Sequence, residues 1–122
     1  MRSREYHLTP YSSTLIVAKG PMKDPMAFYQ YLAKRYDADF SKVLKADPTW
    51  AGCCLKVDGT VLVWIADPES DHLINTVSHE AFHAVRKVMQ YAGVPWLTKK
   101  NEESWAYMQG WITEIVLDFM VE

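Results

Sequence analysis

The stretch CCLKVDGTVLVWIA, residues 53–66, decides the fold class because it predicts two strands joined by a tight turn. Residues 53–57 and 61–66 are rich in apolar and β-branched side chains, which favour extended backbone. Asp58 and Gly59 lie between them, and this dipeptide is favoured in hairpin turns because glycine tolerates positive φ. We therefore expect a β-hairpin in the middle of the chain.

The residues before this hairpin predict one strand and one helix. Residues 14–18 form a short β-branched and apolar run that ends at Gly20, next to a proline. From Pro25 to Leu44, apolar and aromatic side chains recur every three or four residues, which is the spacing of one helix face. We expect a strand over residues 14–18 and an amphipathic helix from Pro25, bent near Asp37.

The residues after the hairpin predict two more helices. Apolar side chains at helical spacing extend from about residue 70 to residue 92, where Gly93 stops the helix. Residues 101–120 repeat this spacing. The whole pattern predicts an α+β fold in which a small antiparallel sheet, made of one strand plus the hairpin, packs on three helices. Residues 1–122 fit one domain of this kind.

Composition and charge argue against several classes of partner. The 13 basic and 15 acidic side chains are interspersed, so no basic patch for nucleic acid is expected. No run approaches the roughly 18 to 20 apolar residues that cross a bilayer, and no secretory signal is visible, so we expect no membrane association. Cys53 and Cys54 are adjacent, and neighbours in a strand point to opposite faces, which strains a bond between them. Two reduced thiols indicate a cytoplasmic protein.

The motif that carries chemistry is H-E-x-x-H, which begins at His79 and ends at His83 inside a predicted helix. Residues four apart lie on one helix face, so both imidazoles can bind one zinc ion at about 2.0 to 2.1 Å. Glu80 lies on the flank of that face, where its carboxylate can take a proton from a water on the ion. The motif therefore favours a zinc-dependent hydrolase. The alternative is that both histidines are ordinary surface residues of an amphipathic helix.

A third protein ligand is expected, because a catalytic zinc site normally has three. The last predicted helix opens with Asn101, Glu102 and Glu103, and a carboxylate there could reach back across an antiparallel helix pair. Through these residues the sequence resembles the gluzincin zinc metallopeptidases, and its small size resembles the minigluzincins, several of which come from phages and bacteria. The resemblance covers roughly residues 61–112.

The resemblance implies that the third zinc ligand is Glu103, because Ala106 then provides the small residue that follows the glutamate in those families. Glu102 competes, since it forms an Asn-Glu pair that is also similar to larger gluzincins, but it would place bulky Trp105 at the small position. Tyr107 stands where many gluzincins have an acidic partner for a histidine. It could donate to the oxyanion of a tetrahedral intermediate, or be a half-buried tyrosine between helices.

The resemblance also implies a peptide or protein substrate, because in those families an edge strand near the metal pairs with an extended peptide. Residues 61–66 directly precede the motif helix. His72 lies seven residues before His79 and near the same helix face, so it could be a fourth ligand, a substrate contact or simply an exposed residue near the helix start. Our leading hypothesis is a zinc metallopeptidase with Glu80 as general base. A catalytically silent binding or regulatory module is the alternative, and an interaction domain with a coincidental motif is a third. The sequence does not predict the oligomeric state.

Overall fold

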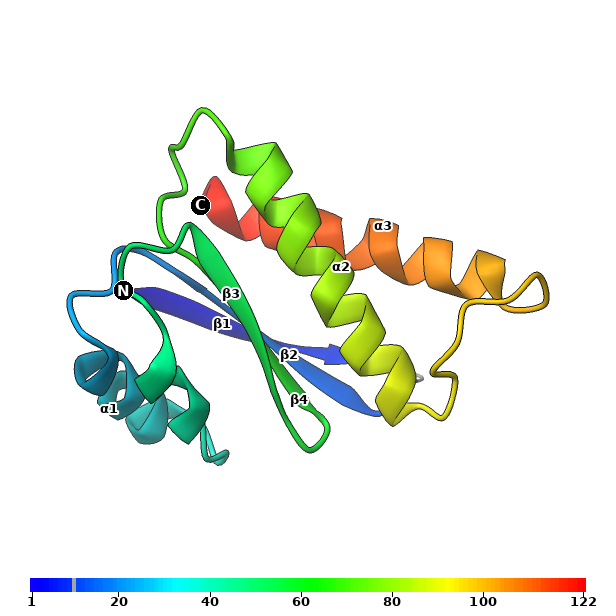
Figure 1. Cartoon of the computed structure of the whole chain (residues 1–122), viewed down its shortest axis with the longest axis horizontal. Coiled ribbons are helices and arrows are strands. Elements are labelled where there is room, and N and C mark those ends of the chain that lie inside the picture. The colour runs from blue at the N-terminus through cyan, green and yellow to red at the C-terminus, as the bar shows by residue number, and fades with distance from the viewer. Residues whose placement is uncertain (10) are drawn as a thin grey trace.

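The computed structural model describes residues 1–9 and 11–122, which form a four-stranded sheet with helices on both of its faces (Figure 1). In chain order the elements are β1 (Arg2–Leu8), β2 (Ser13–Lys19), α1 (Pro25–Arg35), the 3-10 helix η1 (Ser41–Lys45), β3 (Gly52–Val57), β4 (Thr60–Ile65), α2 (Leu73–Tyr91) and α3 (Glu102–Met120). The predicted α+β class is confirmed. No helix in the described ranges is both long enough and apolar enough to span a membrane.

The sheet is mixed, so the prediction of an antiparallel sheet is wrong. Its strand order is β1-β2-β4-β3, in which β2 and β4 are parallel and both outer pairs are antiparallel. The reason lies in where the chain re-enters the sheet. Lys19 at the end of β2 and Gly52 at the start of β3 both pair with Ile65, so β3 begins at the end where β2 finishes. The hairpin then turns β4 parallel to β2 and places it between β2 and β3.

Strand β1 is a fourth strand that the sequence pattern did not predict. Its residues Arg2, Arg4 and Glu5 are largely exposed, so this edge strand lacks the apolar run of the central strands. Charged residues are typical of edge strands, where they oppose pairing with other chains. The predicted hairpin, by contrast, is confirmed, and its turn places Asp58 at φ 51°.

Both faces of the sheet are buried, which explains why β2 and β4 each contain an unbroken apolar run, residues 15–18 and 61–65. One face packs against α2 and α3 through residues such as Val17 and Val63. The other packs against α1 and η1 through Ile16 and Trp64. Cys53 and Cys54 are free thiols whose side chains contact opposite cores, in agreement with the sequence prediction.

The first predicted helix is shorter than expected. Asp24 caps its start by accepting a hydrogen bond from the backbone N–H of Ala27 at 2.8 Å, but α1 ends at Arg35. The chain is extended at Tyr36, and the Asp39 side chain then accepts a hydrogen bond from the N–H of Ser41, at the start of η1. The expected bend near Asp37 is therefore a complete break between two helices.

Candidate metal centre

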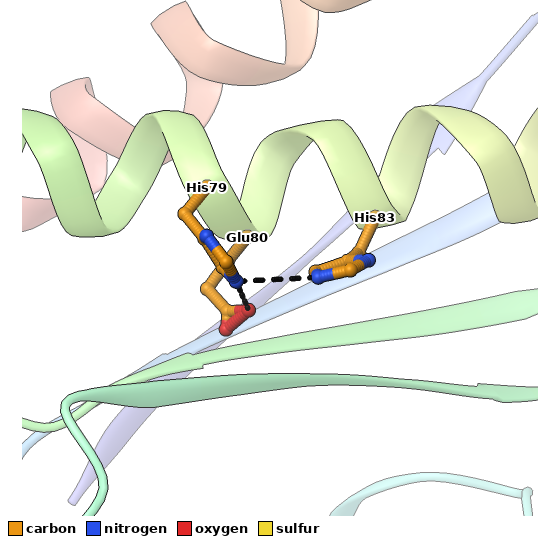
Figure 2. A group of neighbouring side chains, drawn as sticks. All are labelled: His79, Glu80 and His83. Atoms are coloured by element: carbon orange, nitrogen blue, oxygen red, sulfur yellow. Dashed lines mark hydrogen bonds and ion pairs between the residues drawn. The ribbon is translucent and has the colours of Figure 1, made fainter.

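Helix α2 positions the candidate site along the edge of the sheet. Its buried side chains, which include Val77, Ala81, Ala84 and Val88, pack into the core between the sheet and α3. The helix stops after Tyr91, where the chain turns through a glycine with positive φ. His79, Glu80 and His83 lie beside this buried stripe, and Figure 2 shows their side chains pointing to the same side of α2, toward the neighbouring strands.

The two histidines are spaced as ligands of one ion. Their Nε2 atoms are 3.3 Å apart. Two ligands at about 2.0 to 2.1 Å from a tetrahedral zinc ion are themselves separated by about 3.3 Å. The ligand atoms of His79, Glu80 and His83 all lie within 4.8 Å of one another. The residues present therefore fit a zinc ion held between the two imidazoles.

Glu80 is the buried member of the group, with only 5% of its surface exposed. Its Oε1 lies 4.0 Å from Nε2 of His79, farther than the two histidine nitrogens lie from each other. Burial raises the pKa of Glu80, and the proximity of His79 and Lys87 partly opposes that effect. A carboxylate with a raised pKa holds a proton more readily, so it can both accept a proton and donate it again. This separation suits a base that contacts a water on the ion and does not bind the ion itself.

The edge strand β3 supports Glu80 from the side opposite α2. A Cβ atom built on Gly52 would lie 3.4 Å from Cγ of Glu80 and 2.5 Å from the backbone oxygen of Trp64. Glycine is therefore the residue that allows β3 to approach both β4 and the Glu80 side chain. The sequence analysis missed Gly52, although a glycine at a strand start is a signal of close backbone approach.

His83 is electronically suited to bind a cation. Partial burial lowers the pKa of His83, and its proximity to His79, Lys87 and Arg86 lowers it further. A neutral imidazole is the form that coordinates metal. The surroundings of His83 thus favour the protonation state that zinc binding requires.

No family model, curated protein or solved structure matches this chain. The chemistry of the site is accordingly inferred from its own residues.

The first turn of α3 brings one of the two candidate glutamates toward the histidines. A groove between α2 and the start of α3 is lined in part by His79 and His83. Glu102 also lines this groove, whereas Glu103 is not among its lining residues. Neither glutamate belongs to the three-residue group, which within the described ranges contains His79, Glu80 and His83 only. The third ligand therefore stays a prediction, and the groove favours Glu102 where the resemblance favoured Glu103.

Two other residues singled out from the sequence lie apart from the histidines. Tyr107 is 65% exposed and packs beside Trp111, with ring centroids 6.0 Å apart. It is not among the residues lining the groove, so its role as an oxyanion donor stays a prediction. His72 occupies the N-cap position of α2, where it is exposed and lies outside the three-residue group.

The sheet edge nearest to the histidines belongs to β3. The sequence directed attention to residues 61–66, but β4 lies between β2 and β3 and has no free edge. Strand β3 is an edge strand, and a hollow of about 300 Å³ lies at its start. The hollow is lined by Trp50 from the segment before β3, by Gly52 of β3, and by residues of α2 that include His79 and Glu80. The edge of the sheet therefore lies directly beside the candidate metal centre.

Proposed function

We propose that this protein is a zinc-dependent metallopeptidase that hydrolyses peptide bonds. The observation that carries the proposal is the 3.3 Å separation of the two Nε2 atoms of His79 and His83, with the buried carboxylate of Glu80 4.0 Å from the nearer one. A purely structural zinc site is closed by four ligands and needs no adjacent base. An open pair of imidazoles with a buried carboxylate supports catalysis better than structure.

Each residue has a distinct role in this proposal. Zinc, when bound, supplies a Lewis acid that lowers the pKa of water and polarises a carbonyl. His79 and His83 hold the ion. Glu80 takes the proton from the attacking water and later delivers it to the leaving amine, and its raised pKa suits both transfers. The zincin-like architecture belongs to this proposal too, and is supported by the motif helix packed beside an edge strand.

The third ligand comes from the first turn of α3 in this proposal. Glu102 and Glu103 are the carboxylates there, and only Glu102 lines the groove that contains both histidines. Replacing each glutamate in turn with glutamine distinguishes the ligand from the non-ligand, because loss of a ligand weakens zinc binding strongly. Isothermal titration with zinc chloride measures this directly. The variant with the larger loss of affinity identifies the ligand.

The substrate is a peptide that adds to β3 as an extra strand. A strand edge supplies main-chain donors and acceptors with little demand on side-chain identity. A peptide bound in the hollow between β3 and α2 would lie beside Glu80, which lines that hollow. A cytoplasmic location suits the two free thiols, which persist where the environment is reducing.

The experiment that tests the proposal compares the wild type with Glu80→Gln. Both proteins are loaded with one equivalent of zinc and incubated with unfolded casein, and fragments are counted by mass spectrometry. The proposal predicts fragments with the wild type and none with Glu80→Gln at equal zinc content. Zinc-loaded wild type that leaves casein and other unfolded proteins intact contradicts it.

A second candidate is a zincin-fold binding or regulatory module that cleaves nothing. The observation in its favour is that, within the described ranges, no carboxylate from α3 joins the three-residue group. A site with two protein ligands binds zinc weakly and could serve recognition alone. This candidate predicts binding to a protein partner with the same affinity for wild type and Glu80→Gln.

A further inference from the structure

Two depressions meet at helix α2 beside the candidate metal centre. One is the groove between α2 and the start of α3, with a volume of about 790 Å³. The other is the hollow of about 300 Å³ between α2 and the start of β3. Among the residues that the structure describes, only Asn75 and His79 line both. A peptide that extends from the hollow into the groove therefore crosses α2 at these two side chains.

Asn75 extends the row formed by the two histidines by one helical turn. Residues four apart lie on the same helix face, about 6 Å apart along the axis, and Asn75, His79 and His83 have this spacing within α2. An extended peptide advances about 3.3 Å per residue. A peptide group bound at Asn75 therefore lies about two residues away from a peptide bond held at His79.

The side-chain amide of Asn75 is not used by the fold. The side chain of Asn101, the chain's other asparagine, donates a hydrogen bond to the backbone oxygen of Trp96 and accepts one from the N–H of Thr98, both at 2.7 Å. The Asn75 side chain, by contrast, is exposed and makes no hydrogen bond with residues 1–9 or 11–122. Asparagine is also a weaker helix former than alanine, by up to about 0.7 kcal/mol. The stability of α2 therefore does not explain this residue, and its amide is available to a ligand.

We propose that Asn75 binds the main chain of a peptide, with its side-chain NH₂ donating to a carbonyl oxygen and its side-chain oxygen accepting from a backbone N–H. The N–H and C=O of one extended residue point to the same side of a strand, so a single asparagine amide matches both. The inference rests on the proposed peptide substrate and adds where that substrate is held. Because only main-chain groups are bound, recognition at Asn75 is independent of the side chains of the peptide.

The test is a titration followed by NMR on the full chain labelled with [¹⁵N]asparagine, with zinc and again with a chelator. Glu80→Gln is the background, so that a peptide stays intact. Asn75 and Asn101 are the two asparagines of the chain, so two side-chain NH₂ pairs appear and that of Asn101 is the internal control. The probes are N-acetyl-pentaalaninamide and N-acetyl-pentathreoninamide, which share the main chain and differ in side chains. Calorimetry compares Asn75→Ala with Gln90→Ala, the matched control, because Gln90 is an exposed amide on α2 that lines neither depression.

The proposal predicts a saturable shift of the Asn75 NH₂ signals with both peptides, while those of Asn101 stay in place. It also predicts binding about tenfold weaker for Asn75→Ala, equivalent to about 1.4 kcal/mol, with either peptide, and no change for Gln90→Ala. Unmoved Asn75 signals, equal affinity of the two variants, or a loss confined to one peptide overturns it. The predicted pattern in a protein that holds no zinc would leave the Asn75 assignment standing and remove the peptidase. A zinc-dependent peptidase without this pattern would remove only the Asn75 assignment.

Discussion

Replacing Gly52 with alanine should weaken the fold and the catalytic site together. The added Cβ would lie 2.5 Å from the backbone oxygen of Trp64, a separation that real Cβ atoms essentially never show. Because that oxygen belongs to β4 in the middle of the sheet, the edge strand must move and no flexible side chain can yield instead. Overpacking of this kind costs about 1 to 3 kcal/mol. We expect the free energy of unfolding to fall by about 2 kcal/mol and the melting temperature by about 8 °C.

The same shift should reach Glu80, whose Cγ would lie 3.4 Å from the new atom. His79 and His83 are on α2, so zinc content should be retained while hydrolysis falls. Urea unfolding, zinc analysis and the casein assay on one preparation measure all three effects. Gly110→Ala is the matched control, because nothing lies within 4 Å of a Cβ there. In the middle of α3 that change should stabilise the protein by about 0.5 to 1 kcal/mol. A Gly52→Ala protein as stable as the wild type would refute the reasoning.

Three further predictions concern single side chains. Glu80→Gln should stabilise the metal-free protein at pH 8, measured by urea unfolding in chelator. Burial raises the pKa of Glu80, so the folded wild type is destabilised only at pH values at which Glu80 is ionised. The stability gained by Glu80→Gln should therefore vanish at acidic pH, and an equal gain at acidic pH and at pH 8 contradicts this. Glu102→Gln should weaken zinc binding at least about tenfold more than Glu103→Gln by calorimetry, and the reverse order would return the ligand to Glu103. Burial raises the pKa of Cys53 and Cys54 from 9.0 to about 12. Iodoacetamide at pH 8 should therefore label the native protein slowly, whereas the urea-unfolded protein should be labelled rapidly at both cysteines, as counted by mass spectrometry. Rapid labelling of the native chain would show that the thiols are accessible.

Much of the fold could be predicted from local patterns. The hairpin around Asp58 and the two long helices α2 and α3 appear where periodicity and turn residues placed them. These signals depend on neighbouring residues alone, which is why a single sequence reveals them. The parallel pairing of β2 with β4 depends on where the chain re-enters the sheet, and no local pattern records that. Strand β1 was missed because an edge strand needs few apolar residues.

The candidate site also combines features that the sequence predicts with features that depend on tertiary contacts. The helical spacing of His79 and His83 predicts a shared metal ion, and the 3.3 Å separation of their facing nitrogens fits that prediction. The role of Gly52 could not be read from helical spacing, because it depends on contacts with β4 and α2, which lie elsewhere in the sequence. Tertiary contacts of this kind are outside the reach of periodicity.

The central claim is that His79 and His83 bind one zinc ion. Metal content measured by mass spectrometry on untagged protein tests it most directly, with the wild type beside His83→Ala. We expect about one zinc per wild-type chain and almost none in the variant, which should remain folded because His83 is not part of the buried core. Absence of zinc from the wild type even after supplementation, or equal zinc in both proteins, would contradict the metal centre and the peptidase built on it.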